Sequence, residues 1–163
     1  MALAVSHRCQ AIAPSPTLAI DTRAKEMKAR GVDVIGFGAG EPDFPTPAHI
    51  VEAAKEALDL GLTRYTPASG TFELRKAICD KLERDNDLYY KPQDIVVSSG
   101  AKHSLYNIFQ AIIDPGDEVL IPTPCWVSYP EMVRMAGGVP IFIPADESTN
   151  FVPTNQDIAR RVT

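Results

Sequence analysis

The segment "DIVVSSGAKHSLYNIFQAIIDPGDEVLIP", residues 94–122, runs from an apolar stretch through small residues and a helical pattern to a second apolar stretch. Short apolar runs bounded by turn residues are typical of buried strands, and a helix between two of them forms a βαβ unit. A third apolar run, 139–144, follows a proline-rich loop. We therefore predict an α/β fold with a mostly parallel sheet that begins near residue 94.

The rest of the chain is predicted to be mainly helical. Pro14 and Pro16 indicate an extended arm over residues 1–16, and a short strand is expected at the start of the glycine- and proline-rich segment 32–47. Thr46 is a candidate N-cap with Pro47 at the first helical position. Residues 151–163 are typical of a loop entering a further helix. Apolar spacing predicts the other helices at 17–30, 47–60, 71–86 and 102–113.

Composition excludes several classes of protein. The 163 residues carry a formal charge of -5 without a Lys/Arg cluster, which argues against a nucleic-acid or anionic-membrane partner. No apolar run approaches the ~20 residues of a membrane helix, and the N-terminus does not resemble a signal peptide. Three cysteines without close Cys or His spacing predict reduced thiols, no disulfide framework and no metal site. A cytoplasmic protein is expected.

The turn at residues 98–102 is a candidate anion site. A helix that begins directly after a strand offers backbone N–H groups without intrahelical partners, and these favour a negative charge. Gly100 and Ala101 leave room for a ligand, and Lys102 adds a positive charge. The P-loop pattern is absent, so a tight strand–helix turn without a ligand remains an equal alternative.

Three other segments contain candidate binding residues. Trp126, the only tryptophan, follows the strand predicted at 118–122, at the sheet edge where α/β proteins bind ligands. It could stack on an aromatic ring or simply anchor a core or an interface. Gly40 lies in a glycine-rich loop, for which ordinary turn formation is the commoner explanation, and Tyr65 lies in a turn that a capped loop explains equally well.

Taken together, the motifs resemble a known family. They are similar, in order and spacing, to the N-terminal part of class I aminotransferases of pyridoxal 5'-phosphate (PLP) fold type I, with bacterial aspartate aminotransferases as the nearest resemblance. The resemblance covers roughly residues 3–163 and implies a partial large domain of α/β/α architecture. The motifs are "AGEPDF", "RYTPASGTFELRKAI", "SSGAKHSLYNIFQAIIDPGDEVLIPTPCWVSYPEMV" and the glycine pair at 137–138.

The resemblance implies a role for each candidate residue. The turn of Gly100, Ala101 and Lys102 would take the PLP phosphate, and Trp126 would stack on the pyridine ring and border the substrate. Gly40 would contact the substrate carboxylate through its backbone. Tyr65 would reach the phosphate in the partner's site, which implies a homodimer whose 1–16 arm lies on the neighbouring subunit. Residues 17–163 would then form an incomplete aminotransferase domain.

The resemblance also implies that catalytic residues are missing from this chain. The lysine that holds PLP as a Schiff base is expected C-terminal to residue 163, so no catalytic residue is assigned here and the chain alone is predicted to be inactive. The parent reaction would transfer an amino group, with aspartate as the first candidate donor, to a 2-oxo acid such as 2-oxoglutarate. Alternatives are an alanine, aromatic, methionine or prephenate substrate, or a non-catalytic binding module.

Overall fold

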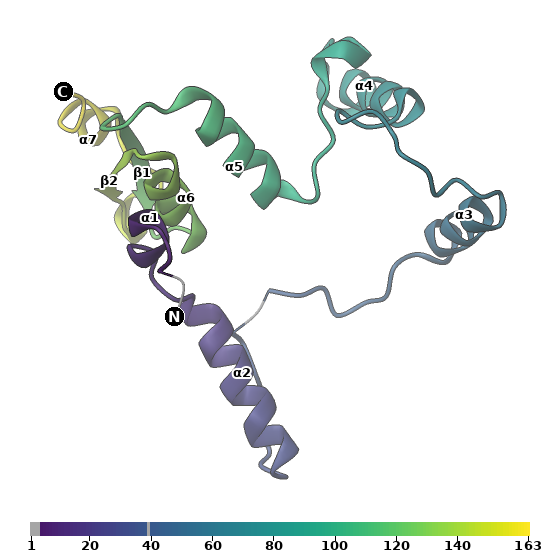
Figure 1. Ribbon diagram of the computed structural model, residues 1–163. Helices are drawn as coiled ribbons and strands as arrows, with labels where there is room; N and C mark the ends of the chain where they lie inside the picture. The colour runs from purple at the N-terminus through teal and green to yellow at the C-terminus, as the bar shows by residue number, and fades with distance from the viewer. Residues whose placement is uncertain (1–3, 39) are drawn as a thin grey trace. The chain divides into compact units, whose positions relative to one another are not determined.

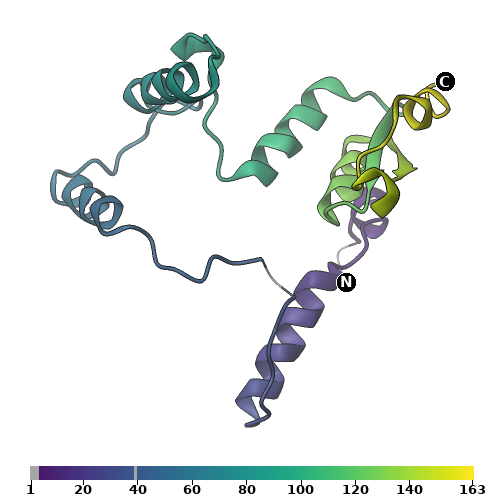
Figure 2. The same cartoon turned by 180° about the vertical axis from the view of Figure 1, so that it is seen from behind.

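The computed structural model describes residues 4–38 and 40–163 and divides into two compact units. The sheet unit comprises the chain up to residue 39 together with residues 102–163, and the helical unit comprises residues 40–101. Figures 1 and 2 show the elements of both units from opposite sides, and each unit is described by itself.

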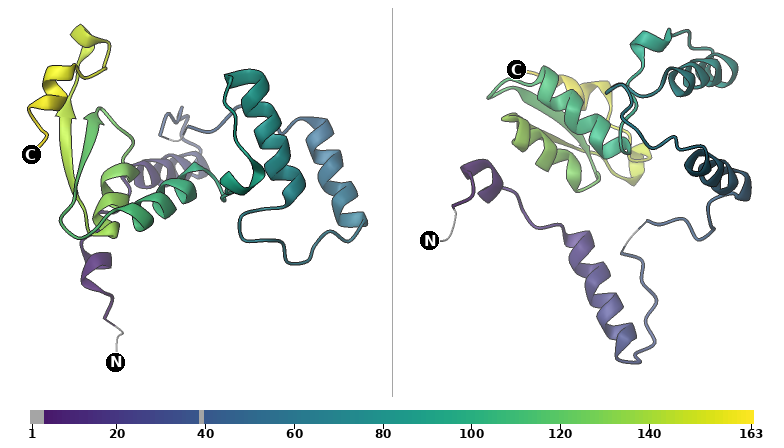
Figure 3. Two further views of the ribbon diagram at one scale, coloured as in Figure 1. Left: turned by 90° about the horizontal axis from the view of Figure 1, so that it is seen from above. Right: turned by 45° about the vertical axis from the view of Figure 1, so that its right-hand side comes forward.

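The sheet unit is built on two parallel strands. β1 (Glu118–Thr123) pairs with β2 (Val139–Pro144) in the register Glu118 to Val139 through Thr123 to Pro144. Helix α6 (Ser128–Ala136) connects them and packs on the strands, and Figure 3 shows the two arrows side by side. The predicted parallel pairing of these two runs is confirmed.

The core of the sheet unit lies between α6 and the strands. Among the described residues its buried apolar side chains are Ile121, Pro130, Met132, Val133 and Ile143, and Val133 is 0% exposed. Gly138 lets β2 approach this core closely, because a Cβ added there would lie 3.0 Å from Val133 Cγ1 and 2.9 Å from Ile113 Cγ2. A larger residue at Gly138 would force the start of β2 away from α6.

Helix α6 corrects a prediction, since the segment between the runs at 118–122 and 139–144 was expected to be a proline-rich loop. Pro130 does not interrupt the helix, because it is the third residue of α6, where a backbone N–H has no intrahelical partner to lose. The helix ends at Gly137, whose φ of +93° suits a left-handed cap. Two parallel strands need a crossover, and α6 provides it.

The N-terminal part of the sheet unit is more helical than predicted. α1 (His7–Gln10) lies within the segment expected to be an extended arm, and α2 (Pro16–Ala29) begins at the last residue of that segment, one residue earlier than predicted. Ser6 and Ser15 cap these helices by accepting backbone hydrogen bonds from Cys9 and Leu18, which makes short helical turns favourable next to the prolines. α1 contacts α6, and the Ala13 N–H donates to Glu131 Oε2 of the same chain at 3.4 Å.

The short strand expected at the start of segment 32–47 is also absent from the described residues. This stretch runs back along α2 without strand hydrogen bonds; a Cβ on Gly36 would lie 3.7 Å from Ala24 Cβ. A strand requires a paired neighbour, and here the neighbour is a helix.

The C-terminal part of the sheet unit contains α7 (Asn155–Ala159), preceded by the single-turn helix η2 (Glu147–Thr149). The predicted entry into a further helix is confirmed. Thr154 and Asp157 form a capping box, and the hydrogen bonds that Thr154 donates lower the pKa of the Asp157 carboxyl.

The helical unit contains α3 (Ala48–Asp59), α4 (Phe72–Asn86) and the single-turn helix η1 (Pro92–Asp94). Thr71 caps α4 by accepting a hydrogen bond from the Leu74 N–H, as expected for a helix starting near residue 71. The cap of α3 was predicted one residue too early. Pro47 occupies the N-cap position and Thr46 precedes it, and α3 has no side-chain cap.

Residues 94–98 do not form the first strand of the predicted sheet. The Val97 N–H donates to Ser69 O at 2.9 Å, so the apolar run pairs with the turn before α4. Gly70 sits in this turn with φ +98°, and a Cβ there would lie 2.7 Å from Val97 Cγ2. The sequence pattern predicted a strand, but no neighbouring strand lies beside these residues in the described part of the chain.

Helix α5 (Ala101–Ile112) joins the two units along the chain and begins one residue earlier than predicted. Its apolar residues Ile108 and Ile112 remain exposed. None of the helices in the described ranges combines the length and apolar character needed to cross a bilayer.

Candidate functional site

The turn that precedes α5 has the geometry of an accessible helix start. Gly100 has a φ of +83°, a conformation that glycine adopts without strain, and its N–H donates to Ser98 O at 2.9 Å. Apart from Gly100 itself and its two chain neighbours, no heavy atom lies within 4 Å of a Cβ built on Gly100. The first backbone N–H groups of α5 therefore follow a turn whose outer surface is open.

Lys102 and Trp126 lie in contact within the sheet unit. Lys102 Nζ is 4.7 Å from the centroid of the Trp126 ring, although 24 positions separate the two residues in the sequence. An ammonium in this position is attracted to the negative face of the indole, with an energy of about 0.5–1 kcal/mol at an exposed site. Trp126 follows the carboxyl end of β1 in the sequence, and it is 41% exposed.

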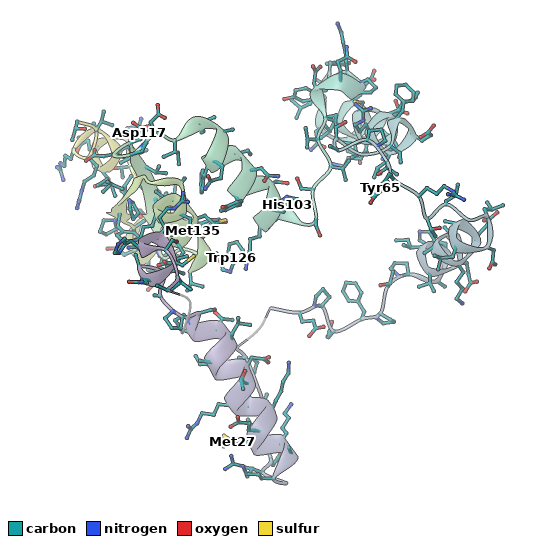
Figure 4. The ribbon with its side chains drawn as sticks, in the orientation of Figure 1. Met27, Tyr65, His103, Asp117, Trp126 and Met135 are labelled. Carbon is teal, nitrogen blue, oxygen red and sulfur yellow. The ribbon has the colours of Figure 1, made fainter. Side chains whose placement is uncertain are left out.

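A second aromatic ring, that of Tyr129, also contacts the indole of Trp126. The rings of Trp126 and Tyr129 meet edge to face, with centroids 5.5 Å apart and an interplanar angle of 86°. The Tyr129 N–H also donates to Trp126 O at 3.1 Å, where the chain turns into α6. Edge-to-face pairs of this kind stabilise by about 0.5–1.5 kcal/mol beyond burial. Figure 4 shows Trp126 with its side chain drawn.

The remaining predicted residues belong to the helical unit. Gly40 is exposed, and apart from its own atoms and its chain neighbours no heavy atom of the described residues lies within 4 Å of a Cβ built on it. Tyr65 is fully exposed in the turn before α4, so its ring and hydroxyl face solvent. Of the six residues predicted for the site, the structure thus brings Lys102 and Trp126 into contact from distant positions, whereas Gly100, Ala101 and Lys102 are neighbours in sequence.

The described residues offer no candidate metal site. They contain no group of three or more His, Cys, Asp or Glu side chains placed to hold a metal ion. Cys79 is buried, Cys125 is half-buried beside Trp126, and Cys9 is exposed, all as free thiols.

Lys102 and Trp126, both in the sheet unit, fit a ligand that combines a negative charge with a flat ring. Lys102 supplies a positive charge near the start of α5, and Trp126 offers a partly exposed aromatic face in contact with it. PLP, with its phosphate and its pyridine ring, has both features.

Comparison with known proteins identifies the family. The sequence profile described as "Aminotransferase class I and II" matches residues 32–163, most of the chain. The chain belongs to the class I and II aminotransferases. Within this family the chain is 52% identical over 159 residues to an aspartate aminotransferase of Bacillus sp. (strain YM-2), covering 98% of the chain and 41% of that relative.

The name of a second relative includes prephenate as well as aspartate. The chain is 53% identical over 163 residues to a probable aspartate/prephenate aminotransferase of Aquifex aeolicus (strain VF5), covering 100% of the chain and 40% of that protein. The chain therefore spans about two fifths of the length of the curated aminotransferases that it matches, in their N-terminal part.

Solved aminotransferase structures confirm the predicted fold class. The aspartate aminotransferase from Thermus thermophilus with maleate superimposes with a TM-score of 0.95 at 46% identity, over 99% of this chain and 42% of that one. The Rhizobium meliloti enzyme gives a TM-score of 0.92 at 44% identity, over 99% and 40%. The chain is thus a partial α/β fold of PLP fold type I, containing its N-terminal region.

Sequence reasoning missed Tyr129 as a neighbour of Trp126. The contact forms where the chain turns into α6, since Trp126 lies just before the helix and Tyr129 is its second residue. A segment predicted to be a loop gave no local signal for it.

Proposed function

We propose that these residues are part of a PLP-dependent aminotransferase that exchanges an amino group between an amino acid and a 2-oxo acid. Aspartate is the first candidate donor and 2-oxoglutarate the first candidate acceptor. The main support is sequence identity: about half of the residues, over nearly the whole chain, are identical to those of relatives named aspartate aminotransferase. Prephenate is the second candidate acceptor, because several relatives carry the name aspartate/prephenate aminotransferase.

The residues of this chain would bind and orient the cofactor. Backbone N–H groups at Ala101 and Lys102, at the start of α5, would donate to the phosphate beside the Gly100 turn, and the Lys102 ammonium would balance its charge. The indole of Trp126 would stack on the ring and exclude water from one side of the substrate. When bound, PLP supplies an electron-withdrawing ring that stabilises negative charge at the α-carbon of the amino acid.

The substrate and the partner subunit would complete the site. The backbone of Gly40 would contact the substrate carboxylate, and the full exposure of Tyr65 suits a residue that serves a neighbouring protomer. We therefore propose a homodimer in which each site takes Tyr65 from the other subunit. No nucleic acid or membrane takes part in this proposal.

The first test separates the enzyme from a non-catalytic module. The coding sequence that follows Thr163 is read, and the protein it encodes together with this chain is assayed for aspartate-dependent formation of glutamate from 2-oxoglutarate. Alanine, aromatic amino acids and methionine serve as competing donors. An in-frame stop codon directly after Thr163 would favour the module and contradict the proposal.

The chain of 163 residues alone is expected neither to transaminate nor to bind PLP covalently. Lys102 lies at the start of α5, next to the proposed phosphate site, which is badly placed for the aldehyde across the ring. The purified chain is incubated with PLP and reduced with borohydride, and any pyridoxyl-lysine is mapped by mass spectrometry. Stoichiometric labelling of Lys102 together with amino transfer would overturn its assignment to the phosphate.

Mixing two inactive variants is expected to restore activity if Tyr65 serves the neighbouring site. One full-length variant carries Tyr65→Phe and the other carries an inactivating change in the C-terminal half. Heterodimers would then contain one site with neither change, so up to about a quarter of the parent activity should return on the symmetry of a twofold dimer. Subunit exchange is verified by native mass spectrometry, and exchange without recovery would contradict a shared site.

A further inference from the structure

We propose that Lys102 covers the indole face of Trp126 until an anion at the start of α5 draws it away, so that phosphate binding exposes the stacking surface. The identity of the ligand in this inference rests on the proposed function. The contact between Lys102 and Trp126 is seen in the structure, with Lys102 Nζ 4.7 Å from the ring centroid. Lys102 thereby controls access to the face of the Trp126 ring and also pairs with the phosphate.

The same ammonium cannot serve both partners equally. A charge-assisted contact with a phosphate oxygen is stronger than the attraction to an aromatic quadrupole. Lys102 is the second residue of α5, directly after the open turn at Gly100, and its flexible four-carbon stem allows the ammonium to move while the helix stays in place.

Trp126 is held while Lys102 moves. The edge-to-face contact with Tyr129 and the hydrogen bond from the Tyr129 N–H to Trp126 O come from α6 and do not involve Lys102. Removal of the ammonium therefore opens a ring face without releasing the ring. The order of events follows: the phosphate binds, Lys102 leaves the indole, and a flat ring can stack.

The single tryptophan makes the contact directly observable. Trp126 gives the only indole N–H resonance in a proton–nitrogen correlation spectrum of the isotope-labelled 163-residue chain. We expect Lys102→Met to shift this resonance by more than its line width and Lys102→Arg to leave it near the parent position, because arginine retains the cation. Lys28→Met, next to the labelled Met27 at the far end of α2, is the matched control and should cause no shift (Figure 4).

Titration with inorganic phosphate tests the displacement. The parent resonance should move toward the Lys102→Met position as phosphate is added, and the resonance of Lys102→Met should stay in place. A parent resonance that does not respond, or equal responses in both proteins, would overturn the proposal. Coincident parent and Lys102→Met spectra before any addition would overturn the contact itself.

Binding of pyridoxamine 5'-phosphate tests the proposed function separately from the displacement of Lys102. Pyridoxamine, which lacks the phosphate, is the control compound. Equilibrium dialysis measures whether the full-length protein binds each compound. Binding of pyridoxamine 5'-phosphate without any Lys102-dependent shift on phosphate addition would overturn the displacement and leave the function intact. A phosphate-dependent shift without binding of pyridoxamine 5'-phosphate would support the displacement and contradict the function.

Discussion

Replacing Val133 with aspartate is expected to unfold the sheet unit. Val133 is 0% exposed between α6 and the two strands, so the carboxylate would lose its water without gaining a partner. Burial of an unpaired charge or its neutralised form costs roughly 3–5 kcal/mol in such a site, which is a large part of the ~5–15 kcal/mol that stabilises a typical domain.

The measurement is urea unfolding followed by the fluorescence of Trp126, which precedes α6 in the same unit. Val152→Asp is the matched control, because Val152 is 63% exposed and the same change there should cost less than about 0.5 kcal/mol. Equal unfolding midpoints for the two variants would contradict the assignment of Val133 to the core.

The Val133→Asp defect should also depend on pH in a defined direction. Burial raises the pKa of an aspartic acid in the folded state, so the folded variant binds its proton more tightly than the unfolded chain. The defect should therefore be largest above the raised folded-state pKa and shrink as pH falls from there toward the lower pKa of the unfolded chain. A defect that is independent of pH would indicate lost packing rather than a buried charge.

Replacing Trp126 with alanine in the full-length protein is expected to weaken PLP retention and lower transamination. Lost stacking and burial should cost on the order of 1–3 kcal/mol, or roughly 5- to 150-fold in affinity. Equilibrium dialysis measures the affinity, and the rate of amino transfer is measured at saturating PLP.

Trp126→Phe is the matched control, because it retains an aromatic face and should recover most of the affinity. Tyr90→Ala, which removes another exposed aromatic ring of the chain, should leave PLP affinity unchanged. If Trp126→Ala binds PLP and turns over like the parent, Trp126 is an anchor for the start of α6 and not a cofactor ligand.

Local signals in the sequence determined most helix boundaries. The helix predicted at 71–86 appears as α4, with Thr71 as its cap, and α2 stops at Ala29, just before Gly31 with its φ of +80°. Caps and helix-ending glycines act through hydrogen bonds and backbone angles within a few residues, so no distant part of the chain is needed to read them. The same holds for the turn at Gly100 and the start of α5.

Tertiary structure decided which apolar runs became strands and which side chains meet. The runs at 94–98 and 118–122 look alike in sequence, yet only the second has a parallel partner, because strand hydrogen bonds come from distant residues. The Lys102–Trp126 contact joins the start of α5 to the loop after β1. The sequence around either residue does not indicate that the two side chains meet. The packing of α6 on the two strands positions the loop that contains Trp126.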